Sequence, residues 1–158
     1  MIKLLRVDYR LIHGQVALSW TQAIGADCLL LANDSVVHDD IRKTTLKLAR
    51  PSGCKLVIKS IDDAIAALNS GVTDKYSLFV IVESIEDAFR LIRGTNGLFT
   101  SVNLGGTKPH PGADHQLATA VFATEADIEL LRSLLADGIE IEIRQVPTER
   151  KLLVQDVL

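Results

Sequence analysis

Aromatic residues, cysteine and tryptophan are all scarce in this 158-residue sequence. Aromatic side chains make up 4% of it and include a single tryptophan, so the core must be built from Leu, Ile, Val and Ala. The only cysteines are Cys28 and Cys54, each flanked by apolar residues, and no C-x-x-C pair or other metal-ligand framework is present. We expect two free, buried thiols in a reducing compartment, and no metal or other cofactor.

The sequence also lacks long apolar runs and a strong excess of charge of one sign. No apolar stretch approaches the ~20 residues that cross a bilayer, and residues 1–10 are too charged for a signal peptide. The formal net charge of −3 gives no electrostatic footprint for nucleic acid. A chain of this length can bury its own core. We therefore predict a single cytoplasmic domain over residues 1–158 that does not bind nucleic acid.

Short apolar runs alternate with helical periodicity about six times along the chain. Strands are expected at residues 2–7, 27–33, 55–59, 76–82, 99–103, 120–123 and 139–143. Helices are expected at residues 15–24, 39–49, 61–68, 85–93 and 124–137, with Ser84 and Thr124 among the N-caps. The alternation predicts an α/β fold: an open, mostly parallel twisted sheet of about six to seven strands, helices on both faces, and the last strand at an edge.

Two segments in the second half of the chain carry their own expectations. Residues 139–143 alternate between isoleucine and glutamate, which predicts a half-exposed edge strand that could serve as an oligomer surface. Residues 104–115 are rich in Gly, Pro and His and are expected to form a mobile polar surface loop. The alternative is that this loop borders the pocket and contacts the sugar or a partner.

The segment most informative about function is residues 6–16, which read RVDYRLIHGQV. It places His13 where the first strand passes into the first helix, and ligand sites in such sheets lie at the carboxyl ends of the strands. Free N–H groups at a helix N-terminus bind anions, and Arg10 adds donors that suit phosphate oxygens. A neutral imidazole is also a competent nucleophile. These residues therefore predict a histidine that carries a phosphoryl group.

Three alternatives compete with this interpretation. A lone loop histidine is often only a solvated side chain or a helix cap. The loop could instead belong to a regulatory module that binds a phosphorylated ligand without turnover, which is our alternative function. It could also belong to a phosphohydrolase, for which Glu83 is the nearest candidate acid.

At the same residues the sequence resembles a known family. DYRLIHGQV followed by Trp20 is similar to the signature of the IIB subunits of the mannose/fructose/sorbose/N-acetylgalactosamine branch of the sugar phosphotransferase system. Residues 36–53, 100–106 and 138–149 also resemble the family's second helix, a glycine-containing loop and the last strand. The resemblance covers essentially the full length.

The resemblance implies a role for each matched residue. His13 would accept a phosphoryl group from a IIA partner and pass it to a hexose or amino sugar entering through IIC and IID membrane partners. Arg10 would stabilise that group, Asp8 would shape the loop or orient the histidine, and Gly14 and Gln15 would supply backbone amides. Ser84 would donate a hydroxyl, although its neighbour Glu83 would repel a phosphate. A homodimer and association with the membrane permease are also implied.

The remaining candidates have plainer interpretations. His110 and His115 lie with Asp114 in the polar loop, but no third well-spaced metal ligand accompanies them. Lys108 and Arg144 are expected to be solvated surface charges. Trp20 is expected in the core or at a dimer contact, because it lies inside a helix. The residue at position 9 is a tyrosine where the family pattern has a smaller or acidic residue.

Overall fold

The computed structural model describes all residues 1–158 and confirms the predicted α/β class. Seven strands form one sheet in the order β3-β2-β4-β1-β5-β8-β9, and β6 and β7 form a separate hairpin. The strands are β1 (Ile2–Asp8), β2 (Cys28–Ala32), β3 (Lys55–Lys59), β4 (Leu78–Val82), β5 (Ser101–Gly106), β6 (His115–Ala118), β7 (Val121–Ala123), β8 (Glu140–Ile143) and β9 (Leu152–Leu153). The helices are α1 (Gly14–Ile24), α2 (Asp40–Leu48), α3 (Ile61–Ser70), α4 (Ile85–Gly94) and α5 (Glu125–Ala136), with short 3₁₀ turns at Val36–His38 and Val154–Asp156.

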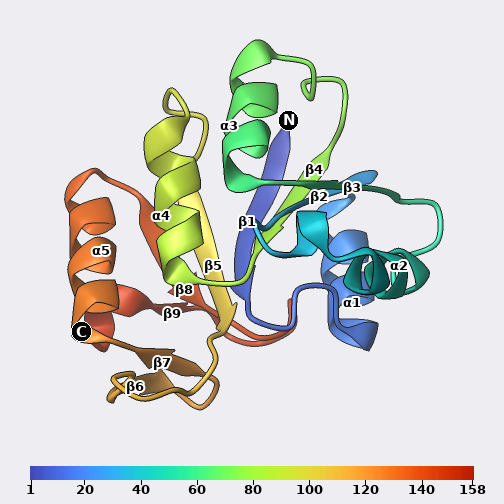
Figure 1. Ribbon diagram of the computed structural model, residues 1–158. Coiled ribbons are helices and arrows are strands. Elements are labelled where there is room, and N and C mark those ends of the chain that lie inside the picture. The colour runs from blue at the N-terminus through green and yellow to red at the C-terminus, as the bar shows by residue number, and fades with distance from the viewer.

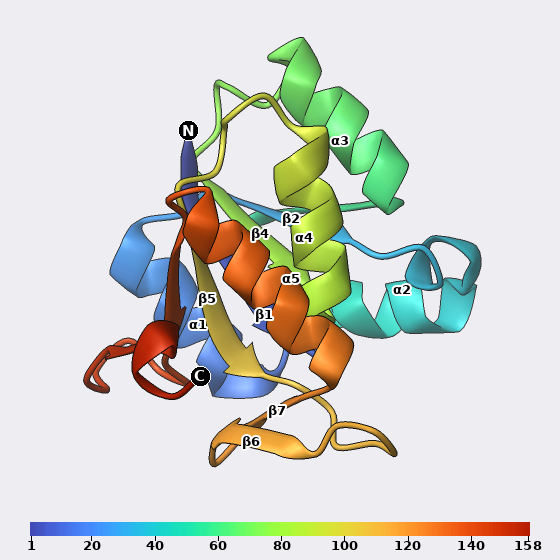
Figure 2. The same cartoon turned by 90° about the vertical axis from the view of Figure 1, so that its left-hand side faces the viewer.

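Helices cover both faces of the sheet because the central strands are apolar on both sides. All five residues of β2 and of β4 are buried. Leu30 and Val80 face one core with α3, α4 and α5, whereas Leu29 and Phe79 face a smaller core with α1. Figures 1 and 2 show α1 on one side of the sheet and α3, α4 and α5 on the other. No helix is both long and apolar enough to cross a membrane.

The prediction that residues 139–143 form an exposed edge strand is wrong. β8 pairs in parallel with β5 along its length and in antiparallel with β9 at Glu142 and Ile143, so it is not the edge strand of the sheet. Ile141, Glu142 and Ile143 are all buried, and Glu142 is paired with Arg144 at 3.0 Å. The sheet instead ends at β9, a two-residue strand that is too short to show an alternation of polar and apolar residues. β8 is therefore not available as an oligomer surface.

The polar loop expected at residues 104–115 is shorter than predicted. β5 continues to Gly106, and β6 already begins at His115. Thr107 is buried and ties the end of β5 to the hairpin, since its amide donates to the Ala120 carbonyl at 2.9 Å and its Oγ1 donates to the Phe122 carbonyl. The β6–β7 hairpin is therefore attached to the carboxyl end of β5, at the bottom of Figure 1.

The sheet order brings three loops together at that same end. β1 lies between β4 and β5, with Val7 opposite Val82 and Asp8 opposite Gly106. The carboxyl ends of β4 and β5 therefore flank the loop that leads from β1 to His13. This position is where open α/β sheets bind their ligands.

Candidate functional site

His13 stands at the N-cap position of α1 with an exposed side chain. Its imidazole makes no capping hydrogen bond, and the first turn of α1 contains no acidic residue. Each of the other four α-helices has a side-chain cap and at least one acidic residue in its first turn. The first turn of α1 thus places no acidic side chain at the positive end of the helix dipole, beside an accessible ring.

The first amides of α1 are free donors. Neither Gly14 nor Gln15 donates its backbone N–H to a carbonyl, whereas those of Val16 and Ala17 point to the His13 carbonyl at 3.2 and 3.5 Å. Gly14 has a positive φ of 48°, and the space where a Cβ would stand is open. The exposed N-terminus of α1 therefore offers two amides to an anion bound at His13.

Two apolar residues anchor the loop that presents His13. Leu11 and Ile12 are buried in the core beneath α1, while Arg10 and His13 on either side are exposed. Leu11 is the one non-glycine residue with a positive φ, at 60°, and its amide donates to the Asp8 carbonyl at 2.9 Å. Such a conformation costs on the order of 1 kcal/mol or more and persists only where packing enforces it. Burial of Leu11 and Ile12 fixes the turn and directs the polar residues outward.

Asp8 holds Arg10 in place. The buried Asp8 Oδ1 accepts from the Arg10 amide at 3.0 Å and from Arg10 Nε at 3.2 Å, and Oδ2 accepts from an Arg10 terminal nitrogen at 3.3 Å. Arg10 keeps about a third of its side chain exposed, so part of its guanidinium still faces solvent. Of the two roles expected for Asp8, this geometry matches shaping the loop. Its oxygens make no hydrogen bond to His13.

Arg6 supports Asp8 from inside the protein. Its guanidinium donates to Asp8 Oδ2 at 3.2 Å, to Asn103 Oδ1 at 2.6 Å, and to the carbonyls of Arg144 and Gln145 at 3.0 Å each. Burial lowers the pKa of Arg6, and the charge of Asp8 partly offsets that effect. Asp8 is thus a shared acceptor between a buried and an exposed guanidinium. The sequence interpretation missed Arg6, although a charge between the apolar residues Leu5 and Val7 of a central strand was a signal.

Trp20 and Gly105 complete the surroundings of Arg6. The Trp20 ring lies 5.4 Å from the Arg6 guanidinium and 5.0 Å from that of Arg144, and its Nε1 donates to the Gln145 carbonyl at 2.9 Å. Trp20 is therefore a core residue. A Cβ on Gly105 would stand 2.1 Å from Arg6 Cζ, so only glycine fits there.

Arg144 is not the solvated surface charge that the sequence predicts. Its guanidinium donates to Glu142 Oε1 at 3.1 Å, and its Nε lies 3.0 Å from Oε2 of the same carboxylate, outside hydrogen-bonding geometry. The Arg144 carbonyl also accepts from Arg6 and from Asn103. Arg144 therefore belongs to the support beneath the His13 loop.

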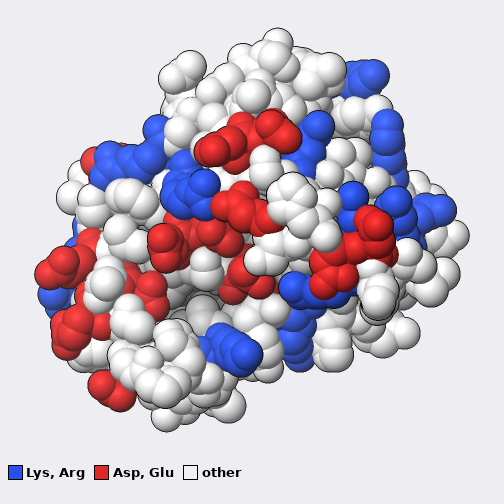
Figure 3. All heavy atoms as spheres, in the orientation of Figure 1, with Lys and Arg blue, Asp and Glu red and all other residues white.

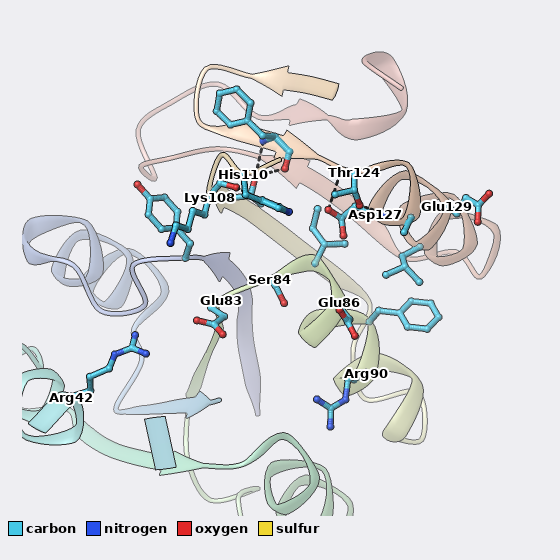
Figure 4. A pocket seen from close by; sticks show the side chains of 17 residues that line it. Arg42, Glu83, Ser84, Glu86, Arg90, Lys108, His110, Thr124, Asp127 and Glu129 are labelled. Atoms are coloured by element: carbon cyan, nitrogen blue, oxygen red, sulfur yellow. Dashed lines mark hydrogen bonds between the residues drawn. The ribbon is translucent and has the colours of Figure 1, made fainter. Parts of the chain in front are cut away.

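A cleft of about 1080 Å³ lies beside the loop (Figure 4). Tyr9, Ser84, Thr107 and Lys108 line it, but His13 and Arg10 do not. The Ser84 Oγ accepts from the Asp87 amide as the N-cap of α4, so its hydroxyl hydrogen remains available to a ligand. Ser84 is thus placed in the neighbouring cleft rather than on the exposed face of the histidine.

The residues of the polar loop do not form a metal centre. His110 Nδ1 lies 2.8 Å from the Lys108 carbonyl, and His115 Nε2 lies 2.5 Å from Glu125 Oε1. No group of three His, Cys, Asp or Glu side chains is arranged to hold a metal ion. Lys108 and His110 border the cleft instead.

Acidic side chains dominate the α4–α5 side of the cleft, where Figure 3 shows them gathered. Glu83, Glu86 and Glu129 line it, and Arg90 is shared among three aspartates, with distances of 2.9 Å to Asp34, 3.6 Å to Asp62 and 3.7 Å to Asp87. A phosphoryl group would be repelled on this side. The observed charges therefore favour the open face of the His13 loop as the anion site.

Asp87 should make the stability of the protein pH-dependent. Burial, and then the charge of Glu83, raise the pKa of Asp87 to about 6. The folded state therefore binds this proton more tightly than the unfolded state, and stability is lost as pH rises from about 4 through 6. We expect Asp87→Asn to raise the free energy of unfolding by about 1–2 kcal/mol at pH 8, because the charge of a largely buried carboxylate is removed.

Urea unfolding at pH 8 and pH 4 checks this expectation. The gain should shrink to a small fraction at pH 4, where the carboxyl is protonated in the folded state and about half protonated in the unfolded state. Asp40→Asn, at an exposed aspartate in the first turn of α2, serves as the control and should show no such pH dependence. An equal effect of Asp87→Asn at both pH values would contradict the assignment.

Comparison with known proteins agrees with the residues around His13. The family model described as the PTS system sorbose subfamily IIB component matches residues 2–158. This chain belongs to that family. It is 31% identical to the sorbose-specific EIIB component of Klebsiella pneumoniae over 155 residues, which are 98% of this chain and 93% of that protein. It is also 35% identical to the mannose-specific EIIAB component of Escherichia coli K12, and it spans about half the length of that relative.

Solved IIB structures share the fold over nearly the whole chain. The IIBSor domain of the sorbose permease from Klebsiella pneumoniae superposes with a TM-score of 0.92 at 30% identity, covering 99% of this chain and 94% of that one. The N-acetylgalactosamine-specific IIB component 1 of Escherichia coli gives a TM-score of 0.87 at 27% identity, covering 96% and 97%. The IIB family is thus supported by sequence and by fold alike.

Proposed function

We propose that this IIB protein carries a phosphoryl group on His13, accepting it from a IIA partner and passing it to a sugar. The observation that supports this most directly is the geometry of the loop. An exposed imidazole stands at an uncapped helix N-terminus, beside two free amides and an arginine held by a buried aspartate. A solvated or capping histidine would need none of these arrangements.

The proposed chemistry is two in-line transfers. A neutral ring nitrogen of His13 attacks phosphorus, so a P–N bond forms on His13 while the P–N bond to the donor histidine breaks. In the second transfer a sugar hydroxyl attacks, the P–N bond to His13 breaks, and the hydroxyl proton is released. Arg10 and the amides of Gly14 and Gln15 stabilise the charge on the phosphoryl oxygens throughout.

The proposed partners follow from the family and from the names of its members. The Escherichia coli relative is called a mannose-specific EIIAB component, a name that combines the IIA and IIB designations. Other relatives are named for sorbose or fructose. We therefore propose a IIA domain as the donor, and IIC and IID membrane subunits as the site where a hexose or amino sugar is phosphorylated.

Replacement of Arg10 tests how the phosphoryl group is held. Arg10→Ala should slow phosphoryl transfer about 10²- to 10³-fold, because a charged donor to the transferring group is lost. The fold should be retained, since Arg10 is partly exposed and Asp8 keeps its bond to Arg6. Rapid-quench transfer from phosphorylated IIA measures the rate, and Arg150→Ala, at an exposed position, is the matched control. A normal rate in Arg10→Ala would show that another group holds the phosphate.

A further inference from the structure

A second cavity lies at the end of the sheet opposite His13. It has a volume of about 240 Å³ and lies between α3, the edge strand β3 and the loop that leads into β4. That loop is at the top of Figure 1, whereas α1 begins near the bottom. The side chains that give the cavity its apolar character are Cys28, Leu30, Val57, Ala67, Val72 and Leu78.

Three lysines and a tyrosine surround this apolar floor. Lys55 and Lys59 lie two residues on either side of Val57 in β3, so all three share one face of the strand. Lys75 and Tyr76 come from the loop before β4. The cavity therefore has a cationic rim built from two separate parts of the chain.

The positive charge of the rim has no protein partner. None of the three lysines forms a salt bridge with a carboxylate, and no acidic side chain lines the cavity. The acidic residues nearest along the chain have other contacts: the Asp27 carboxylate accepts a hydrogen bond from the Ser77 amide, and the Asp74 side chain lies against Gly71. An organic anion would supply the missing counter-charge.

Tyr76 places a hydroxyl at the same rim. Lys55 Nζ lies 3.2 Å from the Tyr76 hydroxyl, and the ammonium groups of Lys55 and Lys75 lie 5.3 and 5.2 Å from the ring centroid. The hydrogen bond from Lys55 lowers the pKa of Tyr76. The two lysines thus converge on one point, next to the apolar floor.

Protection of an exposed sheet edge explains only part of this arrangement. Lysines on edge strands discourage pairing with other chains, and β3 is an edge strand. Lys75, however, does not belong to β3, and protection of an edge requires no apolar hollow. Lys55 and Lys75 converge on one point from two parts of the chain, and Lys59 lines the same cavity, an arrangement that suits an anionic ligand.

We propose that this cavity binds a small organic anion with one carboxylate or phosphate group and an apolar body. At roughly 30 Å³ per water-sized group, the cavity accommodates an apolar body of about eight non-hydrogen atoms, with the anionic head outside it at the lysine rim. Fully hydroxylated molecules such as sugar phosphates do not match the apolar floor. This site is independent of the phosphoryl transfer proposed for His13.

Octanoate and octylammonium are matched probes of the proposal, because they share the apolar chain and differ in the sign of the head group. Titration of the intact protein, followed by methyl NMR, should show octanoate binding with a Kd of about 0.1–1 mM, as expected for a ligand of this size. Shifts should centre on Val57, Val72 and Leu78, and octylammonium should cause none. Equal binding of both probes, shifts elsewhere, or no binding of octanoate would overturn the proposal.

Variants separate the cavity from general surface charge. Lys55→Gln combined with Lys75→Gln should raise the Kd for octanoate about tenfold or more. The charge-matched control, Lys3→Gln with Arg150→Gln, replaces two exposed cations that lie outside both cavities and should leave the Kd unchanged. An equal weakening in both variants would mean that net charge rather than this site attracts the probe. Both variants should retain phosphoryl transfer at His13, which keeps the two proposals distinguishable.

Discussion

His13→Ala should abolish sugar phosphorylation, reducing it to the level of an assay without the IIB protein. The nucleophile of both proposed transfers is the imidazole, and no other exposed nucleophile lies at the uncapped start of α1. The side chain makes no capping hydrogen bond, so its removal should not unfold the protein. Sugar phosphorylation in a reconstituted system with IIA and the membrane subunits is the measurement.

His38→Ala is the matched control for this prediction. His38 is also an exposed histidine, in the short 3₁₀ turn before α2, and no structural feature suggests a phosphate there. The control should keep full activity. Substantial residual transfer in His13→Ala, or equal losses in both variants, would contradict the role given to His13.

Arg6→Leu should lower the free energy of unfolding by about 3–5 kcal/mol, the cost of breaking a buried ion pair by removing one partner. Arg6 is 2% exposed and donates to the Asp8 carboxylate, the Asn103 amide oxygen and two backbone carbonyls. Leucine fills much of the volume but leaves Asn103 Oδ1 without a donor, and it removes one of the donors to the Asp8 carboxylate and to each of the two carbonyls. Denaturant unfolding followed by circular dichroism measures the loss.

Lys3→Leu is the control, because it removes an exposed cation from the same strand and should change stability by no more than about 0.5 kcal/mol. The double variant Arg6→Leu/Asp8→Leu should recover part of the loss, because it also removes a buried carboxylate that Arg6→Leu leaves with the partly exposed Arg10 as its only cationic partner. An Arg6→Leu effect below about 1 kcal/mol would show that the network beneath the loop does not depend on Arg6.

Local sequence patterns were sufficient to predict the fold class and most elements. Continuous apolar runs mark β2 and β4, since both faces of these strands are covered, and Ser84 and Thr124 cap their helices as expected. The edge-strand prediction is wrong because an alternation of polar and apolar residues indicates an exposed strand face only where that face contacts water. In β8 the apparent polar face is occupied by an internal ion pair between Glu142 and Arg144.

The site was predictable where it is local and not where it depends on distant contacts. His13, Arg10 and Gly14 lie within a few residues of one another, so their types and spacing indicate an anion site. The support from Arg6 joins residues 97 and 138 positions away, at Asn103 and Arg144, which only the folded sheet brings together. In the same network, the Asp8 carboxylate accepts its side-chain hydrogen bonds from Arg6 and Arg10 and none from His13.

The most direct test of the central claim is where the phosphoryl group resides. Wild-type protein incubated with phosphorylated IIA should gain the mass of one phosphoryl group, and the modified peptide should contain His13. The bond should be labile in acid and stable in alkali, as expected for phosphohistidine. Reversible phosphate binding without a mass increase would support the regulatory-module alternative instead, and a phosphoryl group on any residue other than His13 would contradict the account.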